Sequence, residues 1–167
     1  MGYVHDSAMS QYIPPNLAHC VTGTWTDIAG QVTGTIVRHC AAAAQTTTIN
    51  VPIILPSTSG SKGSMLASVE VDYELIGAAA TSVTISLNKV TRGSDTAVAV
   101  VSAVTGTQLL TPATTAATLD QHKDKFTVTT PAYIDNDEYY LLKVVVVQAA
   151  ATQIDLLGFV ANYTARL

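Results

Sequence analysis

The segment 69–75 constrains the fold more than any other part of the sequence, because its polarity alternates at every residue. It reads Val-Glu-Val-Asp-Tyr-Glu-Leu, so apolar side chains stand at the odd positions and acidic side chains at the even ones. Successive side chains of a β-strand point to opposite faces of the sheet, whereas the faces of a helix repeat about every 3.6 residues. The pattern therefore predicts a strand with one face in a core and the other face against water or a partner.

A second alternating segment follows at 83–88, where apolar residues at the odd positions alternate with polar ones. Gly77 and the three alanines after it separate the two segments, and small residues of this kind suit a turn. We therefore expect 69–75 and 83–88 to pair as an antiparallel hairpin.

The rest of the chain contains further short segments rich in valine, threonine and isoleucine, bounded by Gly, Pro, Ala and Ser. Such a series predicts an all-β fold, an antiparallel β-sandwich of about eight strands that is jelly-roll-like, with an immunoglobulin-like strand order left open. Residues 105–121 are small and polar and predict a long loop. The other expected strands are 19–25, 31–40, 46–55, 96–104, 125–130, 138–148 and 154–166.

Residues 1–18 differ from the rest, and we expect them to form an extended N-terminal arm beside a single sandwich domain at 19–167. The pair Pro14-Pro15 excludes a regular helix there. The arm is too apolar for a solvated tail, so it must pack either on its own domain or on a neighbouring subunit, and we favour the neighbour. The interface residues expected in the arm are Tyr3, Met9, Tyr12, Ile13 and Leu17.

The chain is poor in the charges that keep monomers apart. Only 12% of its residues are charged, 48% are hydrophobic and the mean hydropathy is +0.32. The segment 139–147 is apolar at almost every position, with Lys143 as the exception. Low charge favours association, so we expect a homo-oligomer, with a trimer favoured.

Charge and hydropathy also argue against several functions. The net charge is −4 and the lysines and arginines form no cluster, which disfavours direct nucleic-acid binding. No stretch reaches the roughly 18 consecutive apolar residues of a membrane span. The N-terminus lacks the basic segment and apolar core of a signal peptide, so we expect synthesis in a cytoplasm and no membrane partner.

Two His-Cys dipeptides, His19-Cys20 and His39-Cys40, are the best candidates for metal or redox chemistry. Adjacent residues of a strand point to opposite faces, so the four side chains converge on a zinc ion only if both dipeptides lie in turns. Two free thiols are the first expectation. A disulfide between Cys20 and Cys40 is the second, if their strands are neighbours, and a metal site is the third.

The acidic run 135–138 is the other candidate, because carboxylates in a loop can bind Ca²⁺. Its spacing departs from that of an EF-hand loop, and a solvated acidic turn is the favoured interpretation. The sequence contains no nucleophile elbow, zinc-protease motif, phosphate loop or dinucleotide fingerprint. We therefore expect a protein that is not an enzyme and has no cofactor or metal.

The arm 1–17, the strands rich in Thr, Ala and Val, the missing signal peptide and the terminal strand 156–167 together resemble small structural proteins of tailed bacteriophages. Such proteins form jelly-roll trimers that decorate capsids, or fibre and spike heads. The resemblance implies a place in the virion after synthesis in a host cytoplasm, with a capsid shell as partner. It assigns no site residue.

The sequence therefore favours a non-enzymatic structural subunit of a homo-oligomer, such as a capsid decoration protein. One alternative is a carbohydrate- or receptor-binding β-sandwich that uses the loops 57–64 and 105–121. The other is a subunit that forms filaments or tubes.

Overall fold

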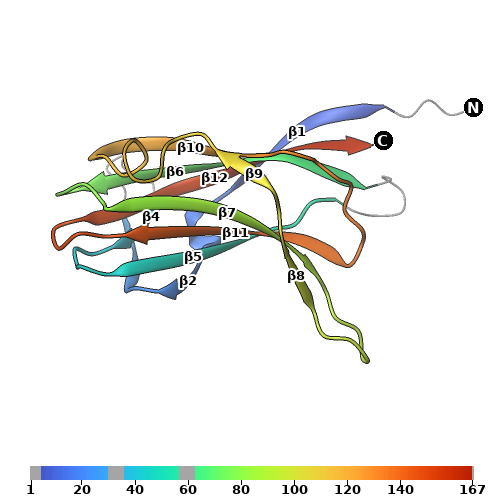
Figure 1. Cartoon of the computed structure of the whole chain (residues 1–167), viewed down its shortest axis with the longest axis horizontal. Helices are drawn as coiled ribbons and strands as arrows, with labels where there is room; N and C mark the ends of the chain where they lie inside the picture. Colours follow the sequence, from blue (N-terminus) through green and yellow to red (C-terminus); the bar gives the residue numbers. More distant parts are fainter. Residues whose placement is uncertain (1–4, 30–35, 57–62, 167) are drawn as a thin grey trace, which may run out of the picture.

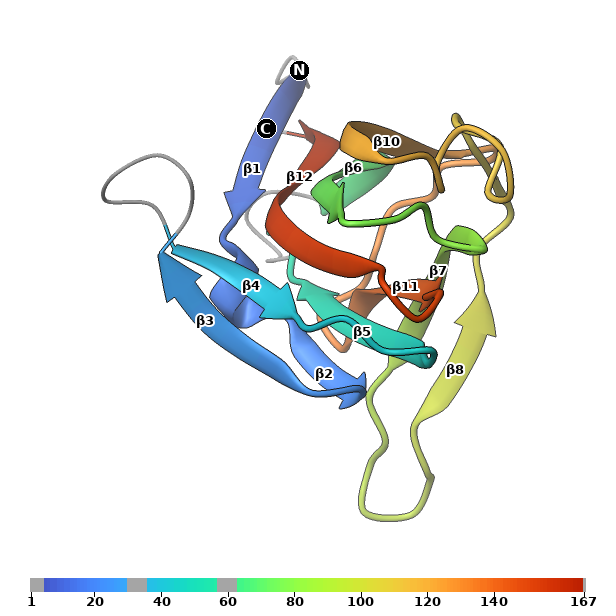
Figure 2. The same ribbon diagram turned by 90° about the vertical axis from the view of Figure 1, so that its left-hand side faces the viewer.

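The computed structural model describes residues 5–29, 36–56 and 63–166, and these form two antiparallel sheets packed face to face (Figures 1 and 2). The predicted all-β sandwich is confirmed, with twelve strands in the described ranges where about eight were expected. The elements are β1 (Asp6–Ile13), the 3₁₀ turn η1 (Pro15–Leu17), β2 (His19–Thr22), β3 (Trp25–Ala29), β4 (Ile36–Cys40), β5 (Thr46–Ile53), β6 (Ser64–Ile76), β7 (Ser82–Thr91), β8 (Val100–Ala103), β9 (Gly106–Gln108), β10 (Asp120–Val128), β11 (Glu138–Val147) and β12 (Gln153–Arg166).

Sheet A has seven strands in the order β3-β4-β12-β6-β10-β9, with β1 also paired to β12. Sheet B has five strands in the order β2-β5-β11-β7-β8. In sheet A, β12 pairs with β6 along one edge. Its other edge pairs with β4 over 154–156 and with β1 over 159–166, so the first strand of the chain lies beside the last.

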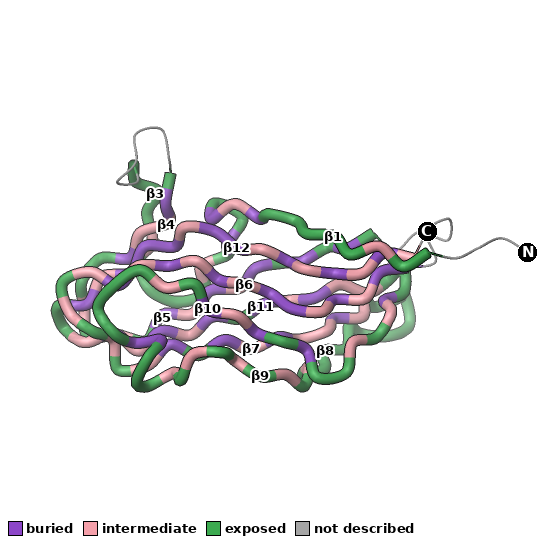
Figure 3. Tube along the Cα trace, turned by 90° about the horizontal axis from the view of Figure 1, so that it is seen from above, coloured by how far each residue is buried: buried purple, intermediate pink, exposed green. Residues whose placement is uncertain are grey.

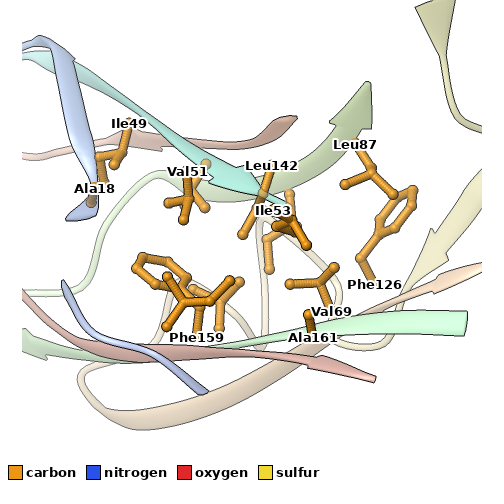
Figure 4. Close-up of a cluster of buried hydrophobic side chains, with 14 of the residues drawn as sticks. Ala18, Ile49, Val51, Ile53, Val69, Leu87, Phe126, Leu142, Phe159 and Ala161 are labelled. Carbon is orange, nitrogen blue, oxygen red and sulfur yellow. The ribbon is translucent and has the colours of Figure 1, made fainter. Parts of the chain in front are cut away.

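The core lies between the two sheets and is filled by alternate side chains. On β6, Val69, Val71 and Tyr73 are each 0% exposed, as the alternation predicts. Figure 4 shows side chains of sheet B, among them Val51, lying over Phe159 of sheet A. Burying an aliphatic or aromatic side chain of this size contributes about 1.5–3 kcal/mol, so the alternating strands supply the main driving force for the fold.

The expected hairpin between 69–75 and 83–88 is wrong, because the two strands lie in different sheets. β6 pairs with β10 and β12, whereas β7 pairs with β11 and β8. The connection at Gly77 crosses between the sheets and packs against a second connection, where a Cβ on Gly77 would lie 2.5 Å from the carbonyl oxygen of Ala151. Short-range turn signals do not distinguish such a crossover from a hairpin.

The N-terminal arm belongs to the sandwich of its own chain. Residues 6–13 form β1, which pairs in antiparallel register with β12, from Asp6 opposite Arg166 to Ile13 opposite Phe159. The expectation that the arm packs on a neighbouring subunit is therefore corrected for this strand. A terminal strand gains main-chain hydrogen bonds only by pairing at a sheet edge, and β12 offers one.

Several other segments differ from expectation. The strand expected at 19–25 is two strands, broken at Gly23, whose φ of 90° favours glycine. The predicted loop 105–121 contains β9 and the start of β10. The strand expected at 31–40 is observed over 36–40, and its first residues lie outside the described ranges. Within those ranges, no helix is long and apolar enough to cross a membrane.

Candidate functional site

The outer face of sheet A is polar and charged. By alternation with the core residues of β6, Glu70, Asp72 and Glu74 point outward. The Glu70 carboxylate lies 3.2 Å from Nζ of Lys123 and 3.8 Å from Nζ of Lys125, both on the neighbouring strand β10. Exposed pairs of this kind contribute little to stability individually. The face is polar and can contact water or a polar ligand.

Asp72 is the carboxylate of this face that the protein satisfies least. Its Oδ1 atom is buried and has no hydrogen-bond partner among the described residues. Burial raises the pKa of Asp72 and the nearby charge of Glu70 adds to this, although Lys123 acts in the opposite direction. In the register of the sheet, Asp72 stands opposite Gly158 of β12.

Tyr12 of β1 lies over the backbone of Gly158. Its hydroxyl donates a hydrogen bond to the carbonyl oxygen of Leu157, with an O···O distance of 3.0 Å. A Cβ placed on Gly158 would come within 2.6 Å of the Tyr12 ring, so only glycine leaves room for it. A β-bulge lies here, at the point where the pairing of β12 passes from β4 to β1. Tyr12 is nevertheless 60% exposed, so much of its ring remains accessible.

Next to this bulge along β12, His39 of β4 and Asp155 of β12 form a hydrogen bond on the same face. Nδ1 of His39 lies 2.5 Å from Oδ1 of Asp155. The carboxylate is mostly buried, at 8% side-chain exposure, and the imidazole is half-buried. The pair joins two strands in register, which accounts for it structurally.

The outer face of sheet B has a different character. Strands β5, β7, β8 and β11 are described in full. Among their outward-facing residues, which alternate with the core residues, Lys143 is the one charged side chain. One cross-strand row consists of Tyr139, Val90 and Val101, and the next contains Leu141 and Pro52. This face, called the sheet B face below, is therefore nearly uncharged.

The β7–β8 hairpin projects away from the sandwich next to this face (Figures 1 and 2). All four residues of β8 are exposed, on both faces of the strand (Figure 3). Val98 is 88% exposed, Val100 56% and Val101 61%. The segment 96–104 contains no charged residue. The expected strand at 96–104 is observed only over Val100–Ala103.

The interface residues expected in the arm differ in their exposure. Ile13 is 3% exposed and belongs to the core of its own chain, so its prediction as an interface residue is corrected. Met9, Tyr12 and Leu17 are 44%, 60% and 57% exposed, so they remain accessible. Tyr3 lies outside the described residues.

Both cysteines are free thiols in the structure, and the disulfide is not formed. Cys40 is buried, and its Sγ lies 3.5 Å from the side-chain amides of Gln148 and Gln45. Burial raises the pKa of the Cys40 thiol. Cys20 is half-buried and its side chain hydrogen-bonds that of Arg38, which also binds Asp27.

The acidic run 135–138 forms a turn whose groups bind one another. Glu138 accepts hydrogen bonds from Lys89 at 2.6 Å and from the backbone N–H of Asp135 at 3.1 Å. The carboxylate is thus occupied within the protein, in line with the interpretation as an acidic turn. Among the described residues, no group of three or more His, Cys, Asp or Glu is placed to hold a metal ion.

Sequence reasoning missed the placement of Tyr12 and the exposure of the hairpin. Gly158 inside an apolar terminal strand was a signal for a bulge or a close approach, but the ring that packs on this glycine comes from Tyr12 of β1, far away in the sequence. The segment 96–104 lacks the polar–apolar alternation of 69–75, and a short apolar run of this kind is typical of a buried strand, so its exposure could not be read from the sequence.

No family model matches the sequence, and no curated protein matches it. Among solved structures, an arabinose-bound α-L-arabinofuranosidase, MgGH51, is 7% identical with a TM-score of 0.45 over 91% of this chain. This chain spans 24% of that enzyme's length. TmCBM61 in complex with β-1,4-galactotriose is 9% identical with a TM-score of 0.40, over 91% of this chain and 85% of that one. A family 35 carbohydrate-binding module from Clostridium thermocellum is 11% identical with a TM-score of 0.37, over 94% and 97%. Likenesses of this size carry no argument about function.

Proposed function

We propose that this protein is a non-catalytic structural subunit that self-associates through the sheet B face and the β7–β8 hairpin. The observation that carries the proposal is the hairpin, in which Val98, Val100 and Val101 are 56–88% exposed in a single chain. Removing apolar surface from water contributes about 25 cal/mol per Å², before the costs of association. The turn of this hairpin carries Arg92 and Asp95, but its segment 96–104 is uncharged and gains this free energy only when another surface covers it.

The free edge of β8 supports the same proposal. β8 pairs with β7 over four residues, Val100–Ala103, and none of the described strands pairs with its other edge. Soluble proteins commonly blunt such edges with lysine, proline or a bulge, and β8 has none of these. Its unpaired N–H and C=O groups are therefore available to a further strand.

A second copy of this chain is the occupant that fits best. The sheet B face offers one charged group, Lys143, so it has little charge pattern with which to select a different partner. A surface with little charge does not repel its own copy, and an antiparallel strand edge pairs with its own copy about a two-fold axis, which gives a dimer. A closed trimer, favoured from the sequence, requires a contact between two different surfaces instead, so the two-fold dimer and the trimer are alternative forms of the self-association that we propose.

Light scattering after size-exclusion chromatography tests self-association. We expect the wild-type chain to elute at a multiple of 17.4 kDa. Val98→Lys combined with Val101→Lys should give a monomer, because lysines on both copies repel. Leu109→Lys is the matched control, since Leu109 is 68% exposed but lies outside the hairpin, and it should leave the mass unchanged. A monomeric wild type at high concentration, or an unchanged mass in the double variant, would overturn the proposal.

The setting that we propose is a virion, with a capsid shell as the surface that the oligomer joins. This part rests on the resemblance of the sequence to phage structural proteins. Mass spectrometry of purified particles should detect the chain at a fixed ratio to the shell protein. Particles that lack it would remove the virion setting and leave self-association standing.

A second candidate function is recognition of a carbohydrate, and a separate observation favours it. Tyr12 presents an exposed ring on a polar face, held by Leu157 and Gly158. Aromatic rings on polar surfaces are suited to the apolar faces of sugars. This candidate is compatible with assembly, since it uses sheet A and assembly uses sheet B.

A further inference from the structure

We propose that Tyr12 and the polar side chains beside it form a binding site for a neutral saccharide on the outer face of sheet A. The inference rests on the second candidate function and names its site and ligand class. It is independent of self-association. The site, called the Tyr12 platform, consists of Tyr12, Gly158, Asp72, Glu70 and Asn162.

The ring is held in place before any ligand arrives. The hydroxyl of Tyr12 is tied to the carbonyl of Leu157 at 3.0 Å, and its tip lies against the backbone of Gly158. An exposed side chain held at both ends loses little conformational entropy on binding, which favours a weak ligand. Tyr12 is 60% exposed in spite of these contacts, so its ring is accessible to a ligand and held in one position.

Planar hydrogen-bonding groups lie on the strands next to the ring. Asp72 is opposite Gly158 and Glu70 is opposite Val160, so both carboxylates belong to the strand one spacing, about 4.8 Å, beyond β12. Asn162 donates to Glu70 at 3.1 Å and accepts from Ser10 at 2.7 Å. A network of this kind fixes the orientation of the polar groups that a ligand hydroxyl would meet.

The combination selects the chemistry of the ligand. A pyranose has a face of C–H groups that stacks on an aromatic ring and a rim of hydroxyls that bind carboxylates and amides. A purely apolar ligand would cover Asp72 and Glu70 without satisfying them, which is costly. Asp72, Glu70 and Glu74 outnumber the two lysines that pair with Glu70, so this part of the face keeps a negative charge, which disfavours phosphates, sulfates and uronic acids.

Asp72 supports the site independently of the Tyr12 ring. Its buried Oδ1 has no hydrogen-bond partner among the described residues, so this carboxylate is incompletely satisfied by the protein. Hydrogen bonds from hydroxyls to an ionised carboxylate are stronger than those between neutral groups. Because Oδ1 is buried, a sugar hydroxyl reaches this acceptor only when the Asp72 side chain turns toward the surface, and it then binds an oxygen whose hydrogen-bonding capacity is unused.

The test uses the full chain, a panel of neutral hexose tetrasaccharides and, as a charged comparison, uronic-acid tetrasaccharides, with binding followed by NMR titration. At least one neutral oligosaccharide should bind and shift resonances of β1 and β12, while the uronic acids should not. Tyr12→Ala should weaken binding by about tenfold or more, and Tyr12→Phe, which keeps the ring, by about threefold or less. Asp72→Asn should weaken binding while the fold is kept.

Met9→Ala is the matched control, because Met9 is an exposed residue of the same strand on its other face, and its binding should equal that of the wild type. Thermal unfolding of each variant checks that β1 remains paired. Wild-type protein that binds no member of the panel would overturn both the site and the carbohydrate function. Binding that survives unchanged in Tyr12→Ala and Asp72→Asn would overturn the site alone.

Discussion

Gln108 donates a hydrogen bond to Asp124 at 2.6 Å, a contact between β9 and β10 of sheet A that orients an amide bridging the two sheets at one side of the sandwich. Gln108 lies on β9 of sheet A, yet its side chain also bonds β7 of sheet B, accepting from the N–H of Ile85 at 2.9 Å and donating to the carbonyl of Val83 at 3.0 Å. Asp124 is 0% exposed and accepts the backbone N–H of Leu110 as well. The side-chain amide of Gln108 thus supplies hydrogen bonds to Val83 and Ile85 on the edge of β7, in the part of that strand that does not pair with β8.

Gln108→Ala should lower the free energy of unfolding by about 2–4 kcal/mol, because it leaves one oxygen of the buried Asp124 carboxylate and two backbone groups of β7 without the hydrogen bonds that Gln108 supplies. Urea denaturation measures the change. The control is Gln121→Ala, an exposed glutamine of β10, which should change stability by less than about 0.5 kcal/mol. Equal effects of the two substitutions would mean that Gln108 does not join the sheets.

A second prediction concerns β1. Ile13→Ala should cost about 2–4 kcal/mol, because Ile13 is 3% exposed and pairs with Phe159 in the core of its own chain. Met9→Ala, at a position 44% exposed, should cost less than about 1 kcal/mol. The loss in Ile13→Ala should not depend on protein concentration. A loss that disappears on dilution would instead place this residue at a subunit contact.

Local patterns in the sequence predicted the strands, because burial alternates within a strand. The segment 69–75 illustrates this, since its apolar positions are all at most 2% exposed. Strand partners are a different matter. β6 pairs with β12, although five other strands lie between them in the chain, and no turn signal encodes that choice.

The candidate site escaped prediction for the same reason. Tyr12 and the Leu157 carbonyl that it binds are 145 residues apart, and the glycine that admits the ring has no local counterpart near Tyr12. The low charge of the chain was visible in the composition. The composition did not show that charged residues are scarcest on the sheet B face and in the segment 96–104, because this depends on which strands share a sheet.

A third prediction follows from Glu138. Burial acts to raise its pKa, but hydrogen bonds from Lys89, the Asp135 N–H and Thr91 outweigh burial, and the pKa is lowered below its ordinary value of 4.5. A carboxyl whose pKa is depressed by folding stabilises the protein above its unfolded pKa and loses that contribution as the pH falls through the folded value. Glu138→Gln should therefore be less stable than wild type at pH 7, with the difference shrinking below about pH 4. Thermal unfolding from pH 3 to pH 7 measures it, and a constant difference would contradict the prediction.

The raised pKa of Asp72 predicts a pH dependence of stability with the opposite sign to that of Glu138. Burial and the charge of Glu70 raise its pKa, so its ionised form is disfavoured in the folded protein, although Lys123 offsets part of this. Its contribution is greatest below the unfolded pKa and is lost as the pH rises through the folded value. Asp72→Asn should consequently be at least as stable as wild type at pH 7 and should lose that advantage in acid. A variant less stable at pH 7 would mean that the carboxylate has a stabilising partner.

The two thiols should differ sharply in reactivity. Cys40 is buried and its pKa is raised by burial, so little thiolate forms and the reagent has no access. Cys20 is half-buried at the end of sheet B and should be alkylated first. Mass spectrometry of the native protein with iodoacetamide at pH 8 should find one adduct, and a second adduct only after unfolding. Cys20→Ser should remove the first adduct and Cys40→Ser the second. A protein that takes no adduct until it is reduced contains the disulfide instead.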